Sequence, residues 1–595
     1  MPASAHTNVA VRQNPPLFFD ERMIKMNKNK FYEIYEIKSL KDMLRKTTEK
    51  HAENTAFLRK LKRGEPYTPV KYKQFKEDVW ALGTAFQSLG LSGKKIAVIG
   101  ENRYEWVCSY MAAVNGDTVV VPIDRELSSP DIINLLKIAE VSAVVYSPKI
   151  SAKLEGAKSE ITGLEYMISM DESDENADQN VPALINVGKE KMNQGDTSFD
   201  DIEIDPEEAK IILFTSGTTA LSKGVLLCHR NICANLMAMC KMVVVHPTDV
   251  FLSVLPPHHT YEGVCGNMAP IYRGACVAFN DGLKYIPTNL VECKATIMLG
   301  VPAIFELLYK RIWAAARQKK IESKLKTGLK LSNALRKVGI DKRRQIFKSV
   351  HDTFGGNLRL FISGAAAIDP KVSKGFRDLG ILFLQGYGIT ECSPIVTLNR
   401  DINYRDSSAG LPLSCMEVKI VDANDEGIGE IICKGDNVML GYYQNEEETS
   451  KVLKDGWFYT GDLGYIDDDG FVYISGRKKN IIIDKNGKNV YPEELETFIN
   501  KSEYVTECMV YAHEDEKGDM EIHAQVYPNY SEIELKLGKD ATDEQIQELI
   551  ESVVDEVNKR NPVWKYIRKV IVRKEEFTKT TTKKIKRYAK ENMED

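Results

Sequence analysis

Apolar runs alternate with amphipathic stretches through much of the chain, beginning at about Lys94. The apolar run "KKIAVIG" is followed by the helix-like "RYEWVCSYMAAVN" and then by the β-branched "DTVVVPID". "SSPDIINLLKIAE" opens with Ser and Pro, as helices often do, and "VSAVVYS" follows as a strand. This alternation predicts parallel βαβ units. It recurs in "ATIMLGVPAIFELLYK" and in "LRLFISGAAAIDPKVSKGFRDLG".

After Ser414 the pattern changes to short strands separated by turns, as in "MEVKIVDANDEG", "GEIICKG" and "GFVYISG". The polar stretch "SGRKKNIIIDKNGKNVYPEELE" then leads into a last segment with strands and helices of its own. We therefore expect a domain boundary near Arg477. The predicted organisation is a loose N-terminal extension over residues 1–30, a large domain over 31–476 and a small domain over 477–595.

The stretch between Tyr309 and Ser349 is strongly basic. Its apolar residues recur at roughly helical spacing, at Leu325, Leu329, Leu335 and Val338. One interpretation is a solvated pair of helices with a stripe that faces the core. The other is a face for anionic lipid or for an acidic partner.

Composition narrows the class of protein. A chain of 595 residues exceeds the usual size of one domain. The net charge of −5, from 80 basic and 85 acidic side chains, argues against a dedicated nucleic-acid binder. Eleven cysteines without a C-x-x-C pair fit neither a zinc cluster nor a disulfide framework, which favours a reducing cytoplasm.

The apolar runs give no sign of a bilayer-spanning helix, and the N-terminal sequence gives no sign of a signal peptide. No apolar run approaches the roughly 18 residues that a bilayer-spanning helix needs. The first residues lack an apolar core followed by a cleavage site, so we expect no signal peptide. Met23 and Met26 leave the natural start of translation open.

A burst of Thr, Ser and Gly with one Lys interrupts the pattern in "LFTSGTTALSKGVLLCHRN". A Walker-type loop needs G-x-x-x-x-G-K followed by Ser or Thr. Gly217 is in place, but Ser222 stands where the second Gly should be, and Gly224 follows Lys223. Hydroxyls, backbone N–H groups and one Lys could still wrap a polyphosphate. A surface loop is the alternative.

Two later stretches carry side chains that would complete a nucleotide site. "QGYGITE" places an aromatic ring, a turn and a Thr–Glu pair after an apolar run, and a hydroxyl and a carboxylate there could hold a nucleotide and its magnesium. "YTGDLGYIDDDGFVYISGRKKN" adds Asp462 for sugar hydroxyls and Arg477 for a hydroxyl or phosphate. Separately, these stretches fit a strand-end turn and a β-hairpin. Together and in this order they favour the nucleotide site.

These motifs resemble the adenylate-forming superfamily of acyl-CoA synthetases, peptide-synthetase adenylation domains and luciferases. The family's T-S-G-T-T-G-x-P-K-G appears as "TSGTTALSKG", and Y-G-x-T-E, T-G-D and G-R-x-x-(D/N) appear as "YGITE", "TGD" and "GRKKN". Within the superfamily, "LPPHHTYE", the basic insertion and the closing "TKKIKR" look most like bacterial long-chain fatty-acid–CoA ligases. The resemblance implies an α/β fold with a large AMP-binding N-terminal domain, which has several subdomains including a β-rich one, and a small mobile α+β C-terminal domain.

Three positions depart from the family pattern. Ala220 and Ser222 replace Gly and Pro in the phosphate loop, and Ala365 replaces the second Gly of the usual S-G-G-A. Loss of Gly removes easy access to positive φ, and loss of Pro loosens one φ. An active enzyme and an impaired nucleotide- or acyl-binding homologue are both compatible with these changes.

The resemblance implies a two-step reaction. A fatty-acid carboxylate attacks the α-phosphorus of ATP, pyrophosphate leaves, and the acyl-adenylate then reacts with the thiol of coenzyme A to release AMP. The implied partners are therefore fatty acid, ATP and coenzyme A, with Mg²⁺ as cofactor and no nucleic acid. A ligase that loads a carrier protein is an alternative. Peripheral contact with the anionic inner face of a membrane, and a homodimer, are left open.

The resemblance also assigns roles to residues. The phosphate loop would act on the β- and γ-phosphates through Thr215, Ser216, Gly217, Thr218, Thr219 and Lys223. Gly364 and Tyr387 would complete the ATP site, with Tyr387 against adenine, and Asp462 and Arg477 would bind the ribose.

The remaining roles concern the reacting groups. Thr390 would contact the α-phosphate, Glu391 would hold Mg²⁺, and His259 would lie near the acyl carboxylate. Lys584 matches the catalytic lysine of the C-terminal domain, in preference to Lys583. In the same domain, Lys479 occupies the hinge position and Gly487 would line the coenzyme A tunnel.

Overall fold

The βαβ alternation predicted from residue 94 onward is present in the computed structural model, which describes residues 31–215, 223–483, 488–514, 520–580 and 584–593. The segment runs through β3 (Lys95–Ile99), α3 (Tyr104–Val114), β4 (Val119–Ile123), α4 (Ser129–Ala139) and β5 (Ala143–Tyr146). β3 pairs in parallel with both β4 and β5. Ser128 caps α4 by accepting from the backbone N–H of Asp131, so the predicted helix start is confirmed.

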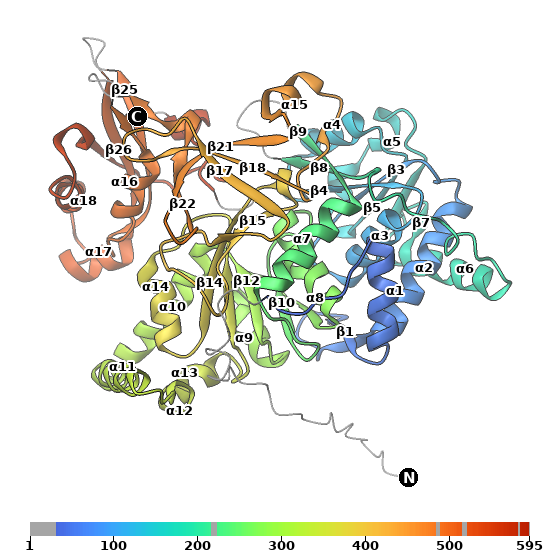
Figure 1. Ribbon diagram of the computed structural model, residues 1–595, viewed down its shortest axis with the longest axis horizontal. Coiled ribbons are helices and arrows are strands. Elements are labelled where there is room, and N and C mark those ends of the chain that lie inside the picture. Colours follow the sequence, from blue (N-terminus) through green and yellow to red (C-terminus); the bar gives the residue numbers. More distant parts are fainter. Residues whose placement is uncertain (1–30, 216–222, 484–487, 515–519, 581–583, 594–595) are drawn as a thin grey trace.

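The first large sheet continues on both sides of this unit (Figure 1). Its order is β19-β9-β8-β4-β3-β5-β6-β7. The other strands are β6 (Tyr166–Ser169), β7 (Gln179–Asn180), β8 (Ala209–Thr215), β9 (Lys223–Cys228) and β19 (Gly441–Tyr442). β8 and β9 form an antiparallel hairpin in which Thr215 lies opposite Lys223. The predicted phosphate loop therefore joins two strands of this sheet.

The second large sheet has the order β16-β15-β14-β13-β12-β10-β11-β1-β2. Its strands are β1 (Thr55–Arg59), β2 (Thr68–Lys71), β10 (Val250–Ser253), β11 (Cys276–Phe279), β12 (Ile297–Gly300), β13 (Leu360–Ser363), β14 (Leu382–Gly388), β15 (Ile395–Leu398) and β16 (Leu411–Pro412). β10, β11, β12, β13 and β14 run in parallel. Their carboxyl ends therefore meet at one edge, where ligands bind in open α/β sheets.

The β-rich region after Ser414 is an antiparallel sheet, as predicted. Its order is β17-β18-β21-β20, and β22 pairs with β21. The strands are β17 (Met416–Val421), β18 (Gly429–Gly435), β20 (Leu453–Lys454), β21 (Trp457–Ile466) and β22 (Val472–Arg477). The predicted domain boundary coincides with the end of β22 and stays a prediction.

The C-terminal segment has its own hydrophobic core. Its strands are β23 (Ile482–Ile483), β24 (Asn489–Val490), β25 (Val505–Glu514), β26 (Met520–Pro528) and β27 (Ile567–Val572). Its helices are α16 (Pro492–Ile499), α17 (Tyr530–Leu537), α18 (Asp543–Asn558) and α19 (Lys590–Met593). Figure 1 shows this segment, in orange to red, beside β22 at one side of the molecule. The α/β fold class with an α+β C-terminal part is thus confirmed.

The remaining helices cover the large sheets or connect their strands. They are α1 (Leu40–His51), α2 (Tyr72–Ser88), α5 (Ala157–Glu160), α6 (Val181–Asn193), α7 (His229–Met242), α8 (Ala269–Arg273), α9 (Ile286–Glu292), α10 (Pro302–Gln318), α11 (Glu322–Lys337), α12 (Arg343–Ile346), α13 (Lys348–Thr353), α14 (Pro370–Asp378) and α15 (Glu446–Val452). All eleven cysteines fall within the described residues and are free thiols, as their spacing predicts. Among the described helices, none has the length and apolar character to cross a bilayer.

The basic stretch is helical, but its apolar stripe is less buried than expected. Ser332 is the fully buried residue of α11, while Leu325, Leu329 and Leu335 are half-buried. Val338 is 70% exposed, so its assignment to a core-facing stripe is wrong. The cause is geometric: α11 packs on α10, α12 and α14 at the edge of the molecule, and no second layer of the described residues covers it. Val338 also lies just beyond its last residue.

Candidate active site

One large cleft gathers most of the residues that the sequence singles out. It has a volume of about 3720 Å³ and lies between the large sheets, the β17–β22 sheet and the C-terminal segment. Its walls include Thr215, Lys223, His259, Gly364, Tyr387, Thr390, Glu391, Asp462, Arg477, Lys479 and Lys584. Ser216, Gly217, Thr218, Thr219, Gly487 and the alternative lysine Lys583 lie outside the described residues.

Asp462, Arg477 and Tyr387 form a connected group in this cleft. Asp462 and Arg477 lie directly opposite each other on β21 and β22. Asp462 Oδ1 forms an ion pair with Arg477 Nε at 2.9 Å, and Asp462 Oδ2 accepts from the hydroxyl of Tyr387 at 2.5 Å. Burial raises the pKa of Tyr387 well above its usual value, so the hydroxyl remains a donor at neutral pH. The group presents a nearly buried carboxylate beside a guanidinium and an aromatic ring.

Lys223 and Glu391 are linked through Tyr442, which the sequence analysis missed. The ring of Tyr442 lies 4.9 Å from Lys223 Nζ, and its hydroxyl donates to Glu391 Oε1 at 2.9 Å. Burial, followed by the Glu391 carboxylate, raises the pKa of Tyr442, so this hydroxyl stays protonated. Tyr442 is positioned by β19, which pairs with β9 directly after the phosphate loop. One side chain thus contacts both the loop lysine and the predicted metal ligand.

Glu448 is a second residue that sequence reasoning missed. Lys223 Nζ donates to Glu448 Oε2 at 2.6 Å. This hydrogen bond, with help from Lys451, lowers the pKa of Glu448 to about 2. Its acidic neighbourhood "NEEETSK" is typical of a solvated helix start, so the sequence gives no signal for a contact with the phosphate loop. In this arrangement the Glu448 carboxylate is bound to Lys223, the side chain that the sequence assigns to a phosphate group.

Thr390 and Glu391 lie on a short turn after β14. The turn is a 3-10 segment, Thr390–Cys392. The backbone N–H of Met439 donates to the carbonyl oxygen of Glu391 at 2.8 Å, which anchors the turn to the segment before β19. The hydroxyl of Thr390 and the carboxylate of Glu391 are thereby held on the wall of the cleft that also carries Lys223.

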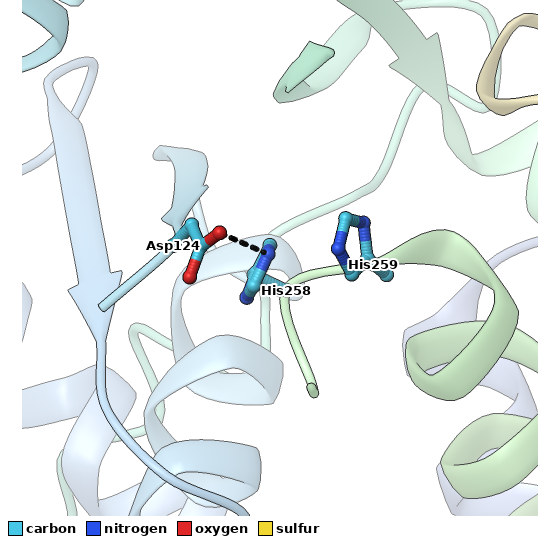
Figure 2. Close-up of side chains that lie close together, drawn as sticks. All are labelled: Asp124, His258 and His259. Carbon is cyan, nitrogen blue, oxygen red and sulfur yellow. Dashed lines mark ion pairs between the residues drawn. The ribbon is translucent and has the colours of Figure 1, made fainter. Parts of the chain in front are cut away.

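The segment after β10 brings two histidines to the cleft. His258 and His259 have ring centres 4.1 Å apart, and His258 Nε2 lies 3.5 Å from Asp124 Oδ2 (Figure 2). Burial lowers the pKa of His259 to about 4 and that of His258 well below 6.5, so both rings are neutral at pH 7. His259 thus lines the cleft, and His258 is an additional polar group beside it. The placement of His259 near the acyl carboxylate stays a prediction.

A π-helix, Tyr261–Met268, follows the histidines and buries a carboxyl group. Glu262 is 1% exposed and accepts from Ser253 Oγ. Burial raises the pKa of Glu262 to about 8, so this group is protonated at neutral pH. The ring of Tyr261 explains why position 364 is a glycine, because a Cβ there would lie 2.8 Å from that ring.

Ala365 adopts the backbone conformation for which a glycine is preferred. Its φ is +69°, in the left-handed region that costs an L-residue with a Cβ roughly 1–2 kcal/mol. The substitution noted in the sequence therefore did not change the turn after β13. The protein keeps the glycine-like geometry and carries its strain.

Lys584 reaches the cleft from the C-terminal segment. It stays accessible to water, but the surrounding walls and then the charge of Arg477 lower its pKa. Its charge also acts on His259 and lowers the pKa of that ring. Arg587 holds the lysine segment by pairing with Glu496 and by donating to the carbonyl oxygen of Val510 at 3.0 Å. Lys584 thus lies near both the Asp462–Arg477 pair and His259.

Lys479 is the middle residue of a 3-10 turn, Lys478–Asn480, that follows β22 and lies between the β-rich sheet and the C-terminal segment. Its backbone oxygen accepts from the hydroxyl of Tyr588 at 3.3 Å, and the same hydroxyl donates to Asn480 Oδ1 at 2.9 Å. The position suits a hinge, since two separately packed parts of the chain meet there. The hinge role itself stays a prediction.

Comparisons with known proteins agree with this geometry. The family described as "AMP-binding enzyme" matches residues 44–443. The chain is 30% identical over 487 residues to long-chain-fatty-acid–CoA ligase 1 of Homo sapiens, covering 75% of this chain and 68% of that protein. It is 29% identical over 485 residues to long-chain-fatty-acid–CoA ligase 5 of Rattus norvegicus, covering 76% and 70%.

Solved structures with the same fold include an anthranilate CoA ligase, AuaEII, in complex with anthranoyl-AMP. The TM-score is 0.74 at 19% identity, covering 94% of this chain and 96% of that one. A fatty acyl CoA synthetase of Mycobacterium tuberculosis has a TM-score of 0.62 at 22% identity, covering 92% and 96%. At these identities the likeness concerns the fold alone.

Proposed function

The chain belongs to the AMP-binding enzyme family, and on that premise we propose that it is an AMP-forming fatty-acid–CoA ligase. The observation that carries the proposal is the meeting of Lys584, the Asp462–Arg477 pair and His259 in one cleft, from three distant segments of the chain. Relatives named as long-chain-fatty-acid–CoA ligases across two thirds or more of their length support the same reaction.

In the first step an oxygen of the fatty-acid carboxylate would attack the α-phosphorus of ATP. A new phosphorus–oxygen bond forms, the bond to the bridging oxygen breaks, and pyrophosphate leaves. Lys584 would stabilise the charge that develops on the α-phosphate, and Thr390 would hydrogen-bond to the same group. Positioning and charge stabilisation of this kind supply most of the rate in such sites.

The nucleotide would be held by the groups already connected in the cleft. Asp462 and Arg477 would bind the ribose hydroxyls, and Tyr387 would lie against adenine. Glu391 fits a Mg²⁺ site because Mg²⁺ prefers carboxylate oxygens. Among the described residues, the side-chain hydrogen bond to this carboxylate comes from Tyr442 and uses Oε1, which leaves Oε2 for the ion. Bound Mg²⁺ would neutralise part of the phosphate charge. Lys223 would exchange Glu448 for a phosphate oxygen.

The acyl chain would extend from His259 along the carboxyl ends of β12 and β13 and along α10. The cleft wall there includes the apolar side chains of Ile286, Val301, Ile304, Leu307 and Leu308, together with the charged Glu306, Lys310 and Arg311 of α10. An alkyl chain buried on such a wall gains about 0.8 kcal/mol per methylene. This gain supports a fatty acid as substrate over a short polar acid.

In the second step the thiol of coenzyme A would attack the acyl carbon and AMP would leave with the bonding electrons. Lys584 and Gly487 belong to one C-terminal segment, so the proposal requires that segment to rotate about Lys479 between the steps. Closure in each step would also keep water from the mixed anhydride.

The decisive experiment measures AMP release with and without coenzyme A over acids of increasing chain length. We expect AMP release to depend on coenzyme A and to be fastest with long-chain acids. Release of acyl-adenylate without use of coenzyme A would favour loading of a carrier protein. ATP binding without pyrophosphate exchange for any acid would favour an impaired homologue.

The basic helices would bring this enzyme to the inner face of a membrane. Exposed cations on α10 and α11 stand near exposed apolar side chains on α11, Leu331 at 54%, and just beyond it, Val338 at 70%. Both helices are at the edge of the molecule in Figure 1. Long basic side chains around apolar ones suit an interface with anionic lipid.

Vesicle binding tests this contact. Binding to vesicles that contain anionic lipid should weaken as salt rises, because the attraction is screened. Changing Lys324, Lys326 and Lys330 to Gln should weaken it, whereas the same change at Lys536, Lys539 and Lys559 on the C-terminal segment should not. Equal effects of the two sets would contradict the proposed face. Light scattering on the same samples decides whether the protein is a homodimer.

A further inference from the structure

Asp124, His258 and His259 form a polar cluster that the proposed reaction does not fully use. Asp124 directly follows β4, and the histidines follow β10, so the two large sheets each contribute to it. The candidate ligand atoms of all three side chains lie within 4.8 Å of one another. Figure 2 shows Asp124 and His258 facing each other, with the ring of His259 beside them.

Imidazole nitrogens of this cluster lack a hydrogen-bond partner among the described residues. Both ring nitrogens of His258 and Nε2 of His259 are buried and have no hydrogen bond to any described residue. His258 is only 7% exposed. A buried polar atom without a partner costs about 1–3 kcal/mol. The acyl carboxylate would satisfy His259 at most, which leaves both nitrogens of His258 in need of a ligand.

The charge of the cluster also points to a cation. Asp124 is 11% exposed and lies at the end of the cleft proposed for a negatively charged carboxylate. Nearby, Arg125 is engaged with Glu126 at 2.9 Å and with Glu101 at 3.6 Å, so its charge is largely compensated. Lys584 is the other cation whose charge reaches His259, and in the proposed reaction the α-phosphate engages it. An anionic side chain beside the site of an anionic substrate therefore still favours an added positive charge.

We propose that Asp124, His258 and His259 bind a divalent transition metal ion such as Zn²⁺, and that this ion inhibits the adenylation step. Two imidazoles and a carboxylate are ligands that Zn²⁺ accepts and that Mg²⁺ does not select. Zn²⁺ bonds of about 2.0–2.2 Å separate neighbouring ligand atoms by roughly 3.3 Å. The His258–Asp124 separation of 3.5 Å is close to this, so small side-chain rotations complete the site.

The inhibitory part rests on the proposed function. Coordination through Nε2 would remove His259 from the acyl carboxylate. A carboxylate that itself binds the ion would lose nucleophilic electron density and would be held away from the α-phosphorus. Zn²⁺ should therefore compete with the fatty acid and not with ATP.

Metal binding is tested directly, without catalysis. The full-length, tag-free protein is stripped with a chelator and titrated with Co²⁺, whose visible absorption reports nitrogen and oxygen ligation, and with Zn²⁺ in equilibrium dialysis. We expect one strong site per chain, weakened at least tenfold in His258→Gln and in Asp124→Asn, since even changes outside the ligand shell cost tenfold or more. Two variants are used so that the result does not depend on a single variant that misfolds, and a thermal melt of each identifies misfolding.

His523→Gln is the matched control, because His523 also stands beside a carboxylate, Glu521 at 3.2 Å, and stacks on His513. It should keep the strong site. No strong site in the parent protein, or a site lost in His523→Gln and kept in His258→Gln, would overturn the proposal.

Inhibition is then measured as pyrophosphate exchange at saturating Mg²⁺, relative to the metal-free rate of each variant. Added fatty acid should relieve Zn²⁺ inhibition in the parent, and His258→Gln should resist Zn²⁺ at least tenfold better. Strong binding with unchanged exchange would refute the inhibitory role. Absence of exchange with every acid would refute the proposed function, while the Co²⁺ spectrum would still decide the metal site.

Discussion

Tyr442 offers a sharp test of how the cleft is organised, because one atom can be removed without disturbing its ring. Tyr442→Phe deletes the hydroxyl that donates to Glu391 Oε1 at 2.9 Å. The ring that lies 4.9 Å from Lys223 Nζ is retained. The change therefore separates the orientation of the metal carboxylate from the packing of the phosphate-loop lysine.

The expected magnitude follows from the type of bond. A hydrogen bond to a charged group contributes about 1.5–3 kcal/mol, and 1.4 kcal/mol is a factor of ten in binding. Glu391 is half-buried, so water replaces the lost donor only in part. We take the lower end of the range and expect roughly a tenfold rise in the Mg²⁺ concentration that gives half-maximal pyrophosphate exchange.

The assay is a Mg²⁺ titration of exchange at fixed ATP and fatty acid. Tyr443→Phe is the matched control, since the Tyr443 hydroxyl bonds to the exposed Glu140 at 3.2 Å, outside the site. Tyr442→Leu should add a rise in the KM for ATP, because Lys223 then loses its aromatic neighbour. An unchanged or lower Mg²⁺ requirement in Tyr442→Phe, with the fold intact, would refute the idea that this hydroxyl orients Glu391.

Four further results are expected. Ala365→Gly should raise the free energy of unfolding by about 0.5–1 kcal/mol in a denaturant titration, because the strain of roughly 1–2 kcal/mol that it relieves at φ +69° exceeds the entropy cost of Gly, roughly 0.5–1 kcal/mol. The parent protein should lose stability as pH rises from about 5 to about 8, and Glu262→Gln should remove this loss. The buried carboxyl of the folded state keeps its proton up to about pH 8, whereas that of the unfolded state ionises near 4.5, so the folded state binds more protons in that window. Glu448→Ala should lower the KM for ATP by no more than about fivefold, as expected for release of Lys223 from a partly exposed pair. Lys584→Ala should slow adenylation by on the order of 10²–10³-fold. Lys584→Arg should extend activity to higher pH, because the surrounding walls and Arg477 lower the pKa of the lysine, which therefore loses its charge as pH rises, whereas an arginine keeps its charge.

Local pattern predicted the elements well wherever one face decides the structure. The alternation from Lys94 to Ser147 has the strands and helices that it predicts, within one or two residues. Buried parallel strands need continuous apolar runs, and their crossover helices need a 3.6-residue period, so both leave a mark in the sequence. At Val338 the period was right and the burial was wrong, because periodicity does not report whether another layer covers the helix.

The site was predictable only where its residues sit in contiguous motifs. Asp462 and Arg477 were identified in this way, and they do pair across β21 and β22. Tyr442 and Asp124 line the cleft, and Glu448 contacts Lys223 on its wall, only because segments distant in the sequence come together. The neighbourhoods of Tyr442, Glu448 and Asp124 have the patterns of an ordinary strand, helix start and strand end. No spacing rule connects such residues, so their contacts appear only when the sheets are assembled.

The contacts of Tyr588 bear on how one C-terminal segment could serve two reactions. Its hydroxyl donates to Asn480 Oδ1 at 2.9 Å, and both residues lie beyond Lys479, so this bond can move with the segment. Its contact with the backbone oxygen of Lys479, at 3.3 Å, touches the hinge candidate itself and has to change when that residue rotates. The bond to Asn480 therefore connects the segment that carries Lys584 to the part of the chain beyond Lys479, which is the part that would move in the proposed rotation. A lysine needed only for adenylation must leave before the thiol enters, and anchoring it beyond the hinge lets a single rotation remove it.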